Sequence, residues 1–527
     1  MIVDTDNVME ILGRLSTAPE KERTTIIESV RPVLGSGEER LKYKSSIENS
    51  DLTILFDCLN ASGKSEIVTA SDILDQILSF IDASLVLSRY LPCLNRCLHH
   101  PQSEVKILVI KFLRRCIKDE QCLGQVMNSG SLIVDVTKAI TDEDNMVAKE
   151  VKLFIYEMAS LRGSEEINSL PFIQPILPIL QELSNQEKEV NRLRIEELMI
   201  MIAKLSTEMT ERVANAGFLQ RICQEVLTDD VLVQLNALEI LSDFAECNHG
   251  ILYLEQKGAL KDMDNLLGQS CSSPMASYLL PGFIKFFGRV SRNQPTNFVE
   301  NYPNFTNTVL SLLADDTDIN NEPGMKNLAI ATIGHISTSI KGKQKIAEID
   351  GFLHDKENGK IMKVLVNGLR YGATNDKVLA LAACGDILSS TEQNKSLSSE
   401  INLKFYQGLI KAGLKNPMEH IFEIIKQPFA ELAQASYIVM QNIARETWGV
   451  SLFTREPGML EYFLDRNVAM KKEGKEMKYE VIRLLQENSA SLDDNIMPPE
   501  MLMRLKRYTR EGPFHVEAQA EVALGEG

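Results

Sequence analysis

Cysteine and histidine side chains gather in one short stretch, CLNRCLHH, which begins at Cys93. Thiolates and imidazoles are the usual ligands of a structural zinc ion, so this cysteine and Cys97, with His99 and His100, form a candidate metal site. The two cysteines, however, are four residues apart in a leucine-rich helical stripe, and the two histidines precede a proline where a helix ends. We therefore expect a packed helix with two buried thiols and a polar turn, and no metal site.

Carboxylates that could act as an acid and a base also occur in adjacent pairs. Glu165 with Glu166, and Glu196 with Glu197, have no histidine or nucleophile close to them in the sequence. The sequence contains no phosphate-binding glycine loop, serine-hydrolase elbow, zinc-protease helix or dinucleotide-binding fingerprint. Such isolated pairs are typical of solvated helix charges. We expect no catalytic residue, no cofactor and no enzymatic activity.

The charge of the chain narrows the classes of partner. The 527 residues include 56 basic and 73 acidic side chains, a net charge of −17. A field of this sign repels phosphate backbones and anionic membranes, so we expect neither nucleic acid nor a membrane as a partner, and favour a basic protein surface. The N-terminus has acids where a signal peptide has bases, and nine cysteines without a close framework are typical of reduced thiols. These features predict a cytoplasmic protein, with the nucleus as an open alternative.

An internal repeat sets the elements that must position any site. Four segments carry apolar residues at the same offsets, +4, +7, +8 and +11, counted from Val105, Val147, Asn191 and Val233. These offsets mark one face of an α-helix, and the starts lie 42, 44 and 42 residues apart, within the range of armadillo and HEAT repeats. We predict an all-α, armadillo/HEAT-like α-solenoid, a curved superhelical array of helical repeats.

The repeat also predicts how the chain is organised. It continues with looser spacing from Leu279, Met325 and Leu432, and it is weak between residues 336 and 432, where one candidate helix begins at Asp376. We expect loosely patterned helical repeats over residues 1–90, an armadillo/HEAT-like array over 91–510 and an acidic, flexible tail over 511–527. We expect the protein to be a monomer on its own.

Glycine followed by an apolar residue or pair recurs between the expected helices. Glycine adopts the left-handed conformation at little cost, so we expect it to end one helix before the next begins. The segments are SGSL, AGFL, KGAL, DGFL and PGML, which end at Leu132, Leu219, Leu260, Leu353 and Leu460. In the repeat after the second of these, we expect Thr228 or Asp229 to cap the long helix.

The side chains that could meet a partner lie on the groove-facing side of the repeat helices, at offsets +6 and +10. Armadillo importers place Trp and Asn at such rungs to clamp a basic peptide, but here only Asn442 fits and the single Trp448 lies elsewhere. The rung charges fall in blocks of one sign, and like charges on neighbouring helices repel unless a partner compensates them. The candidate partner-binding residues are Lys111, Arg115, Glu157, Glu197, Met201, Glu239, Asp243, Lys285, Arg289, His335 and Asn442.

Several segments resemble the proteasome non-ATPase regulatory subunit 5 family in order and spacing, from about residue 90 to the tail. They are YLLPGFIKFFG at 278–288, QPFAEL at 427–432, Trp448, LDRNV around Arg466, KYEVIRLL from Lys478 and YTREGPFHV from Tyr508. The first 90 residues fit only as a looser helical stretch.

The resemblance implies a chaperone that assembles the base of the 26S proteasome regulatory particle. Such a protein binds the C-terminal domain of one or more proteasomal AAA ATPase subunits, accompanies the base subassembly and is absent from the finished proteasome. It needs no cofactor and no ATP hydrolysis of its own. A generic armadillo or HEAT scaffold, such as a transport adaptor, stays open as the alternative, and the sequence does not identify the ATPase.

Overall fold

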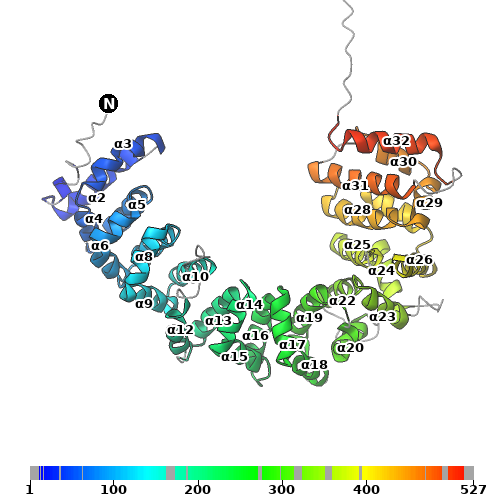
Figure 1. The fold of residues 1–527 in the computed structure, drawn as a ribbon, viewed down its shortest axis with the longest axis horizontal. Helices are drawn as coiled ribbons and strands as arrows, with labels where there is room; N and C mark the ends of the chain where they lie inside the picture. The colour runs from blue at the N-terminus through cyan, green and yellow to red at the C-terminus, as the bar shows by residue number, and fades with distance from the viewer. Residues whose placement is uncertain are drawn as a thin grey trace, which may run out of the picture. The chain divides into compact units, whose positions relative to one another are not determined.

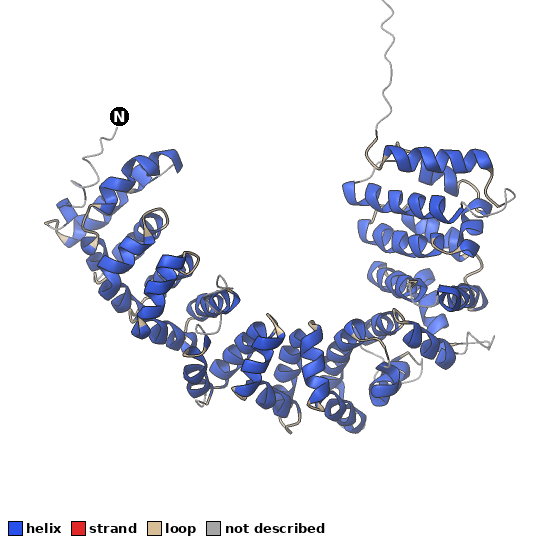
Figure 2. Cartoon of the chain, viewed as in Figure 1, coloured by secondary structure: helices blue, strands red, loops and turns tan. Residues whose placement is uncertain are grey.

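The structure is a computed structural model of the chain. It describes residues 11–515 except 12, 16, 35–36, 62, 162–172, 186–187, 271–275, 297, 314–322, 351–358, 391–394, 469–470 and 490–495. Every regular element in these residues is a helix, which confirms the prediction of an all-α helical array (Figure 2). No helix in the described ranges is long and apolar enough to cross a membrane.

The chain divides into two compact units, residues 1–222 and 223–527. The first unit contains α2 (Glu20–Glu28), η1 (Arg31–Leu34), α3 (Gly37–Glu48), α4 (Thr53–Cys58), α5 (Lys64–Leu78), α6 (Ala83–Leu98), α7 (Ser103–Cys116), α8 (Glu120–Asn128), α9 (Gly130–Lys138), η2 (Ala139–Thr141), α10 (Asn145–Ser160), α12 (Ile176–Ser184), α13 (Glu189–Ala203) and α14 (Thr207–Asn215). The dividing point lies within α15 (Phe218–Val226).

The second unit continues with helices alone. It contains α16 (Val231–Phe244), α17 (Asn248–Gln256), α18 (Ala259–Ser270), α19 (Ala276–Asn293), α20 (Phe298–Asn301), α21 (Pro303–Leu312), α22 (Pro323–Ile336), α23 (Ile340–Asp350), α24 (Lys360–Tyr371), α25 (Thr374–Leu388), α26 (Lys395–Lys411), α27 (Pro417–Ile425), α28 (Ala430–Ala444), α29 (Thr447–Arg455), α30 (Met459–Leu464), α31 (Lys472–Ser489) and α32 (Pro499–Glu511). The division at residue 222 falls inside the range 91–510, which the sequence treats as one array. The boundaries after residues 90 and 510 stay predictions, and tail residues 516–527 lie outside the described part.

One helix of each repeat, here called the third helix, packs on the third helix of the next repeat (Figure 1). In the first unit α7 packs on α10 and α10 on α13, and in the second unit contacts run from α16 through α19, α22, α25 and α28 to α31. The residues at +4, +7, +8 and +11 of α7, α10, α13 and α16 are all buried, at most 7% exposed. The repeat read from the sequence is therefore the interior of each stack.

The second unit has an aromatic cluster at the start of its stack. Phe287 of α19 lies with its ring centroid 5.0 Å from that of Phe305 on α21 and 5.3 Å from that of Tyr302. Phe283 and Phe286, at offsets +4 and +7 counted from Leu279, are also fully buried, which confirms the register of this repeat. Aromatic rings packed edge to face or offset contribute stability beyond the apolar area they bury.

The glycine signal is correct at three of the five segments. Gly217, Gly258 and Gly458 have φ angles of 82°, 74° and 74°, in the left-handed region. Gly130 instead opens α9 directly after Ser129, and the segment ending at residue 353 lies outside the described residues. The expected cap of α16 is wrong by one or two residues, because the side chain of Asp230 accepts the main-chain N–H groups of the second and third helical residues.

Two glycines allow neighbouring third helices to approach closely in the second unit. A Cβ atom at Gly334 would lie 3.0 Å from the Cα of Ala383, and one at Gly385 would lie 3.0 Å from Cγ2 of Ile438. Real Cβ atoms rarely come so close to other heavy atoms, so these positions require glycine at the present spacing between helices. The backbones of α22 and α25 therefore lie close together at Gly334, and the side chain of Ile438 on α28 packs directly on the backbone of α25 at Gly385.

Truncation of the aromatic core tests the fold. We expect Phe286→Ala to destabilise the second unit by about 3 to 5 kcal/mol, because it removes a fully buried ring. Phe429→Ala is the matched control, since this ring at the start of α28 is 51% exposed and its loss should cost below about 0.5 kcal/mol. Thermal unfolding followed by circular dichroism measures both. Equal melting temperatures for the two variants would contradict the register.

Candidate partner-binding surface

The rung positions of the first unit lie on α7, α10 and α13. Lys111 is exposed, whereas Arg115 is half-buried, and its guanidinium lies 5.3 Å from the ring centroid of Phe112. Burial lowers the pKa of Arg115. Glu157 and Met201 are half-buried and Glu197 is exposed. The face is thus a mixture of open and partly covered side chains.

Each acidic rung of the first unit has a cation from the preceding third helix. Arg114 on α7 donates to both carboxylate oxygens of Glu157 on α10, and it also lies 2.6 Å from a carboxylate oxygen of Glu150. Hydrogen bonding to Glu157 is the main cause of a raised pKa at Arg114. One repeat further on, Nζ of Lys152 lies 2.6 Å from Glu197.

The second unit also pairs charges between neighbouring third helices, but here the acids are on the earlier helix and the bases on the later one. Nζ of Lys285 on α19 lies 2.5 Å from Glu239 on α16, and the guanidinium of Arg289 lies 2.6 Å from Asp243. The expectation that neighbouring rungs leave like charges for a partner to compensate is therefore wrong at these positions. The block of acids is neutralised within each unit by bases on adjoining helices, some of them at offsets other than +6 and +10.

The last two candidate rungs are less accessible. His335 on α22 is half-buried, and burial lowers its pKa. Asn442 on α28 is 5% exposed, and its side-chain amide donates to the main-chain oxygen of Gly385, 2.8 Å away. Asn442 is therefore buried between α28 and α25, where its amide joins the two helices, and a role for it in partner binding stays a prediction.

The cysteine and histidine stretch is part of the helix packing. Cys93 and Cys97 are buried on α6, as expected, and burial raises the pKa of Cys97 to about 12. Nε2 of His99 lies 3.3 Å from Asp135, and Nδ1 of His100 accepts the main-chain N–H of Gln102. No group of three potential metal ligands is found among the described residues. Of the carboxylate pairs, Glu196 is buried 3.0 Å from Arg221, and Glu165 and Glu166 lie outside the described residues.

A buried polar network in the second unit was not expected from the sequence. Nζ of Lys343 on α23 donates to the main-chain oxygen of Ser389 and to Oδ1 of Asn402, 2.5 and 2.9 Å away. The amide of Asn402 in turn donates to Glu446, which also accepts the hydroxyl of Ser390. Burial lowers the pKa of Lys343 to about 8. Because Lys343 is 1% exposed and its bonds are made internally, the network stabilises the fold rather than offering a reactive amine.

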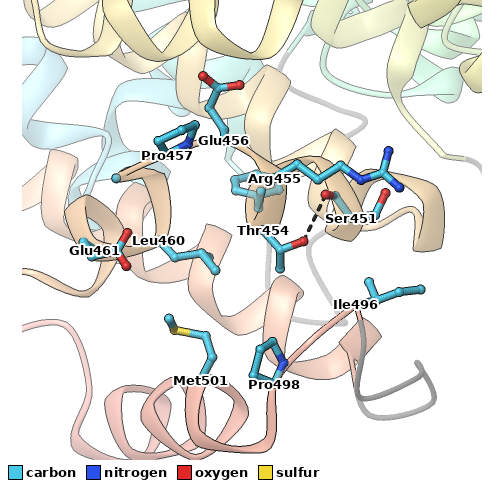
Figure 3. A pocket seen from close by; sticks show the side chains of 12 residues that line it. Ser451, Thr454, Arg455, Glu456, Pro457, Leu460, Glu461, Ile496, Pro498 and Met501 are labelled. Atoms are coloured by element: carbon cyan, nitrogen blue, oxygen red, sulfur yellow. Dashed lines mark hydrogen bonds between the residues drawn. The ribbon is translucent and has the colours of Figure 1, made fainter.

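A pocket of about 370 Å³ lies between α29, α30 and the start of α32 (Figure 3). Its lining combines apolar side chains, such as Leu460 and Met501, with Arg455 and Glu461. The hydroxyls of Ser451 and Thr454 donate to main-chain oxygens of their own helix. Neither hydroxyl is therefore held by a general base for nucleophilic attack.

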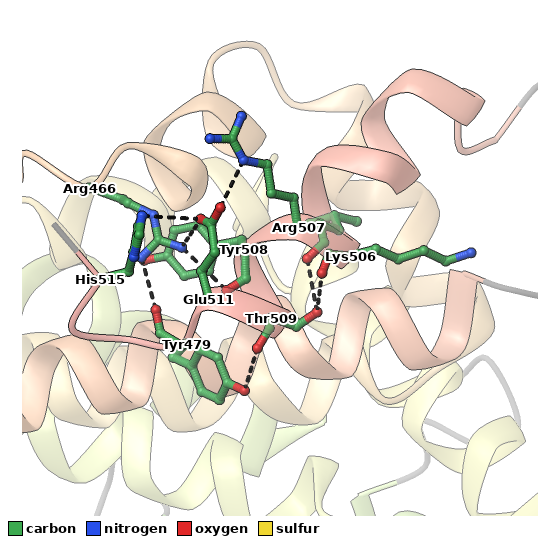
Figure 4. A network of polar contacts seen from close by, with 10 residues as sticks. Arg466, Tyr479, Lys506, Arg507, Tyr508, Thr509, Glu511 and His515 are labelled. Atoms are coloured by element: carbon green, nitrogen blue, oxygen red, sulfur yellow. Dashed lines mark hydrogen bonds and ion pairs between the residues drawn. The ribbon is translucent and has the colours of Figure 1, made fainter. Parts of the chain in front are cut away.

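Three of the segments that carry the family resemblance converge at the end of the second unit (Figure 4). The guanidinium of Arg466 lies 3.8 Å from the ring centroid of Tyr508 and donates to the main-chain oxygens of Tyr508 and Gly512. It also lies 3.0 Å from the carboxylate of Glu511, and the hydroxyl of Tyr479 donates to the oxygen of Thr509. Together these contacts hold the C-terminal end of α32 on α31 and on the turn between α30 and α31.

Comparison with known proteins gives one consistent result. A family model described as "Proteasome non-ATPase 26S subunit" matches residues 24–526. Proteins named 26S proteasome non-ATPase regulatory subunit 5 from Bos taurus and Homo sapiens are each 27% identical to the chain, over 89% of its length and 90% of theirs. The protein of the same name from Drosophila melanogaster is 23% identical, over 89% of the chain and 88% of its own length.

Removal of Arg466 tests what the C-terminal contacts do. We expect Arg466→Ala to increase amide hydrogen exchange in 499–511 strongly, because two main-chain oxygens and a carboxylate lose their shared donor, at a cost of about 2 to 3 kcal/mol. Arg507→Ala is the control, since Arg507 lies 2.9 Å from the same Glu511 but its side chain is 63% exposed. Equal protection of α32 in both variants would show that Arg466 does not hold this helix.

Proposed function

Because the chain belongs to the proteasome non-ATPase 26S subunit family, we propose that it is an assembly chaperone for the base of the 26S proteasome regulatory particle. In this role it binds the C-terminal domain of one or more proteasomal ATPase subunits, accompanies the base subassembly and is absent from the finished proteasome. It acts as a monomer, without catalysis or a cofactor, in the cytoplasm or the nucleus. The observation that carries the proposal is the family match along almost the whole chain.

The fold suits binding of a folded domain. In each unit the third helices lie side by side, so residues of one offset recur along the stack on one face. A row of this kind contacts a partner at many points without reshaping it. The groups with strongly displaced pKa values, such as Lys343 and Lys478, are buried and hydrogen-bonded, so they support binding rather than chemistry as the role of the protein.

Direct binding tests the proposal. The purified chain should bind the isolated C-terminal domain of at least one proteasomal ATPase in the absence of ATP, and affinity purification from lysate should recover ATPases without the proteolytic core. Mass spectrometry of the purified material decides between the classes of function. Import cargo or a phosphatase would support a general scaffold, and turnover of a small substrate would support an enzyme.

The paired rungs allow a test of charge that keeps the fold intact. Glu239→Lys with Asp243→Lys places four cations together, so we expect a lower melting temperature, slower association with a basic ATPase domain and a flatter salt dependence. Adding Lys285→Glu and Arg289→Glu restores both ion pairs with reversed polarity and should recover stability and association rate. Stopped-flow association at several salt concentrations measures the rates. If the rate is unchanged in the double variant, the rung carboxylates do not attract the partner.

A further inference from the structure

The third helices carry a further position on the rung face. It lies one residue before the residue from which the offsets are counted and is here called position −1. Positions −1, +6 and +10 are separated by seven and four residues, so they share one face of a helix. On α16 these residues are Leu232, Glu239 and Asp243, and on α19 they are Tyr278, Lys285 and Arg289. Position −1 therefore lies about 10 Å before the first charged rung along the same face.

Large apolar side chains at position −1 are left open to solvent. Leu232 is 70% exposed and Tyr278 is 64% exposed, although their helices pack on each other. In the first unit the corresponding residues of α10 and α13, Met146 and Val190, are also more than half exposed. The buried residues of α25 and α31 place the starts of their repeats at Asp376 and Gly474. On α7, α22, α25, α28 and α31 position −1 is Glu104, Gly324, Asn375, Glu431 and Glu473. Apolar residues at −1 are thus confined to four consecutive third helices.

The surroundings of Leu232 and Tyr278 identify the chemistry of an occupant. The turn that leads into α16 adds Leu227, which is 46% exposed, and two exposed carboxylates, Asp229 and Asp230. No ion pair to either carboxylate is found in the described residues, whereas the rung acids beyond Leu232 are already paired with Lys285 and Arg289. Along α16, Leu232 therefore lies between the carboxylates of the turn, which have no ion pair among the described residues, and the ion-paired carboxylates of Glu239 and Asp243.

We propose that Leu227, Leu232 and Tyr278 form the affinity-determining contact of the partner site, and that they bind a segment with two or three apolar side chains followed by Lys or Arg. This inference rests on the proposed function, so the segment belongs to the C-terminal domain of a proteasomal ATPase. The apolar side chains cover Leu232 and Tyr278, and the base meets Asp229. Tyrosine is among the residues that most often dominate binding when an interface desolvates them.

A matched pair of double variants tests the patch. Leu232→Ser with Tyr278→Ser removes the proposed contact, and Leu252→Ser with Tyr371→Ser removes the same residue types at exposed positions on α17 and α24. We expect the first variant to raise the Kd for the ATPase domain at least tenfold, about 1.4 kcal/mol, mainly through faster dissociation. The control should stay within twofold. Both variants should keep the melting temperature of the parent chain, because all four side chains are exposed.

Charge at the turn provides a second measurement. Asp229→Lys should slow association and reduce its dependence on salt, whereas Asp262→Lys, an exposed carboxylate on α18, should change neither. Asp230 is kept because its side chain caps α16.

The outcomes separate this inference from the proposed function. If the parent chain binds an ATPase domain and Leu232→Ser with Tyr278→Ser binds equally tightly, the patch is not the contact, while the function stands. If the parent chain self-associates and this variant abolishes only self-association, the patch joins copies of the chain and the inference is overturned. If no proteasomal ATPase domain binds the parent chain, the function fails and the inference fails with it.

Discussion

A single repeat cannot bury its own apolar stripe, and this constraint governs the rest of the structure. The stripe of α16, for example, includes Leu241 and Phe244, which are completely buried in a unit where α16 packs on α19. The next helix must therefore be present before the first is stable. Stability in such an array is a sum of interfaces between neighbours, and each interface uses the face that the previous one leaves open. Where the interface contains Gly334 or Gly385, the approach is close enough to exclude a larger residue.

The same constraint determines what remains for a partner. Helices held side by side bring long charged side chains within reach of each other, so the rungs become ion pairs between repeats, such as Lys152 with Glu197. Exposed pairs of this kind contribute little stability, about 0 to 1 kcal/mol each, but they remove net charge from the face. Apolar side chains at the ends of the helices, such as Leu232, form no ion pairs with the neighbouring helix and stay exposed. The paired rungs thus leave little net charge on this face, so the proposed partner site relies on its exposed apolar side chains for affinity.

The sequence predicts what is local to one helix and fails where two helices must be aligned. The buried stripe and the left-handed glycines are local, so they could be identified by counting residues. The contact between Glu239 and Lys285 joins residues 46 apart, and it depends on which turn of α16 lies beside which turn of α19. Counting residues along one helix does not give this relative alignment of the two helices. Asn442 illustrates the same limit, because only the close approach of α25 converts an apparent rung into a buried hydrogen-bond donor.

Buried charge was missed for a different reason. A lysine such as Lys343 has no local sign that it is buried, because lysines are usually exposed and its partner Asn402 lies 59 residues away. The desolvation cost is offset only by hydrogen bonds that the sequence does not display. The resemblance to the family, by contrast, draws attention to residues that the structure does use in its packing. Segments around Arg466, Lys478 and Tyr508 are prominent in the sequence. In the structure Arg466 holds the end of α32, and Lys478 bonds α31 to the main-chain oxygen of Asp465.

The location of those segments bears on where function lies. Residues that hold a terminal helix have demanding geometry, since Arg466 stacks on a ring and donates to two main-chain oxygens at once. Few other side chains meet these requirements, so we expect little tolerance of substitution at Arg466. A partner surface has looser requirements, because an exposed apolar residue of suitable size serves at each position. Met146 and Val190 in the first unit, and Leu232 and Tyr278 in the second, differ in type, yet each lies at position −1 and is more than half exposed. Within each unit, the position in the repeat is therefore a better guide to exposed apolar side chains than the identity of the residue.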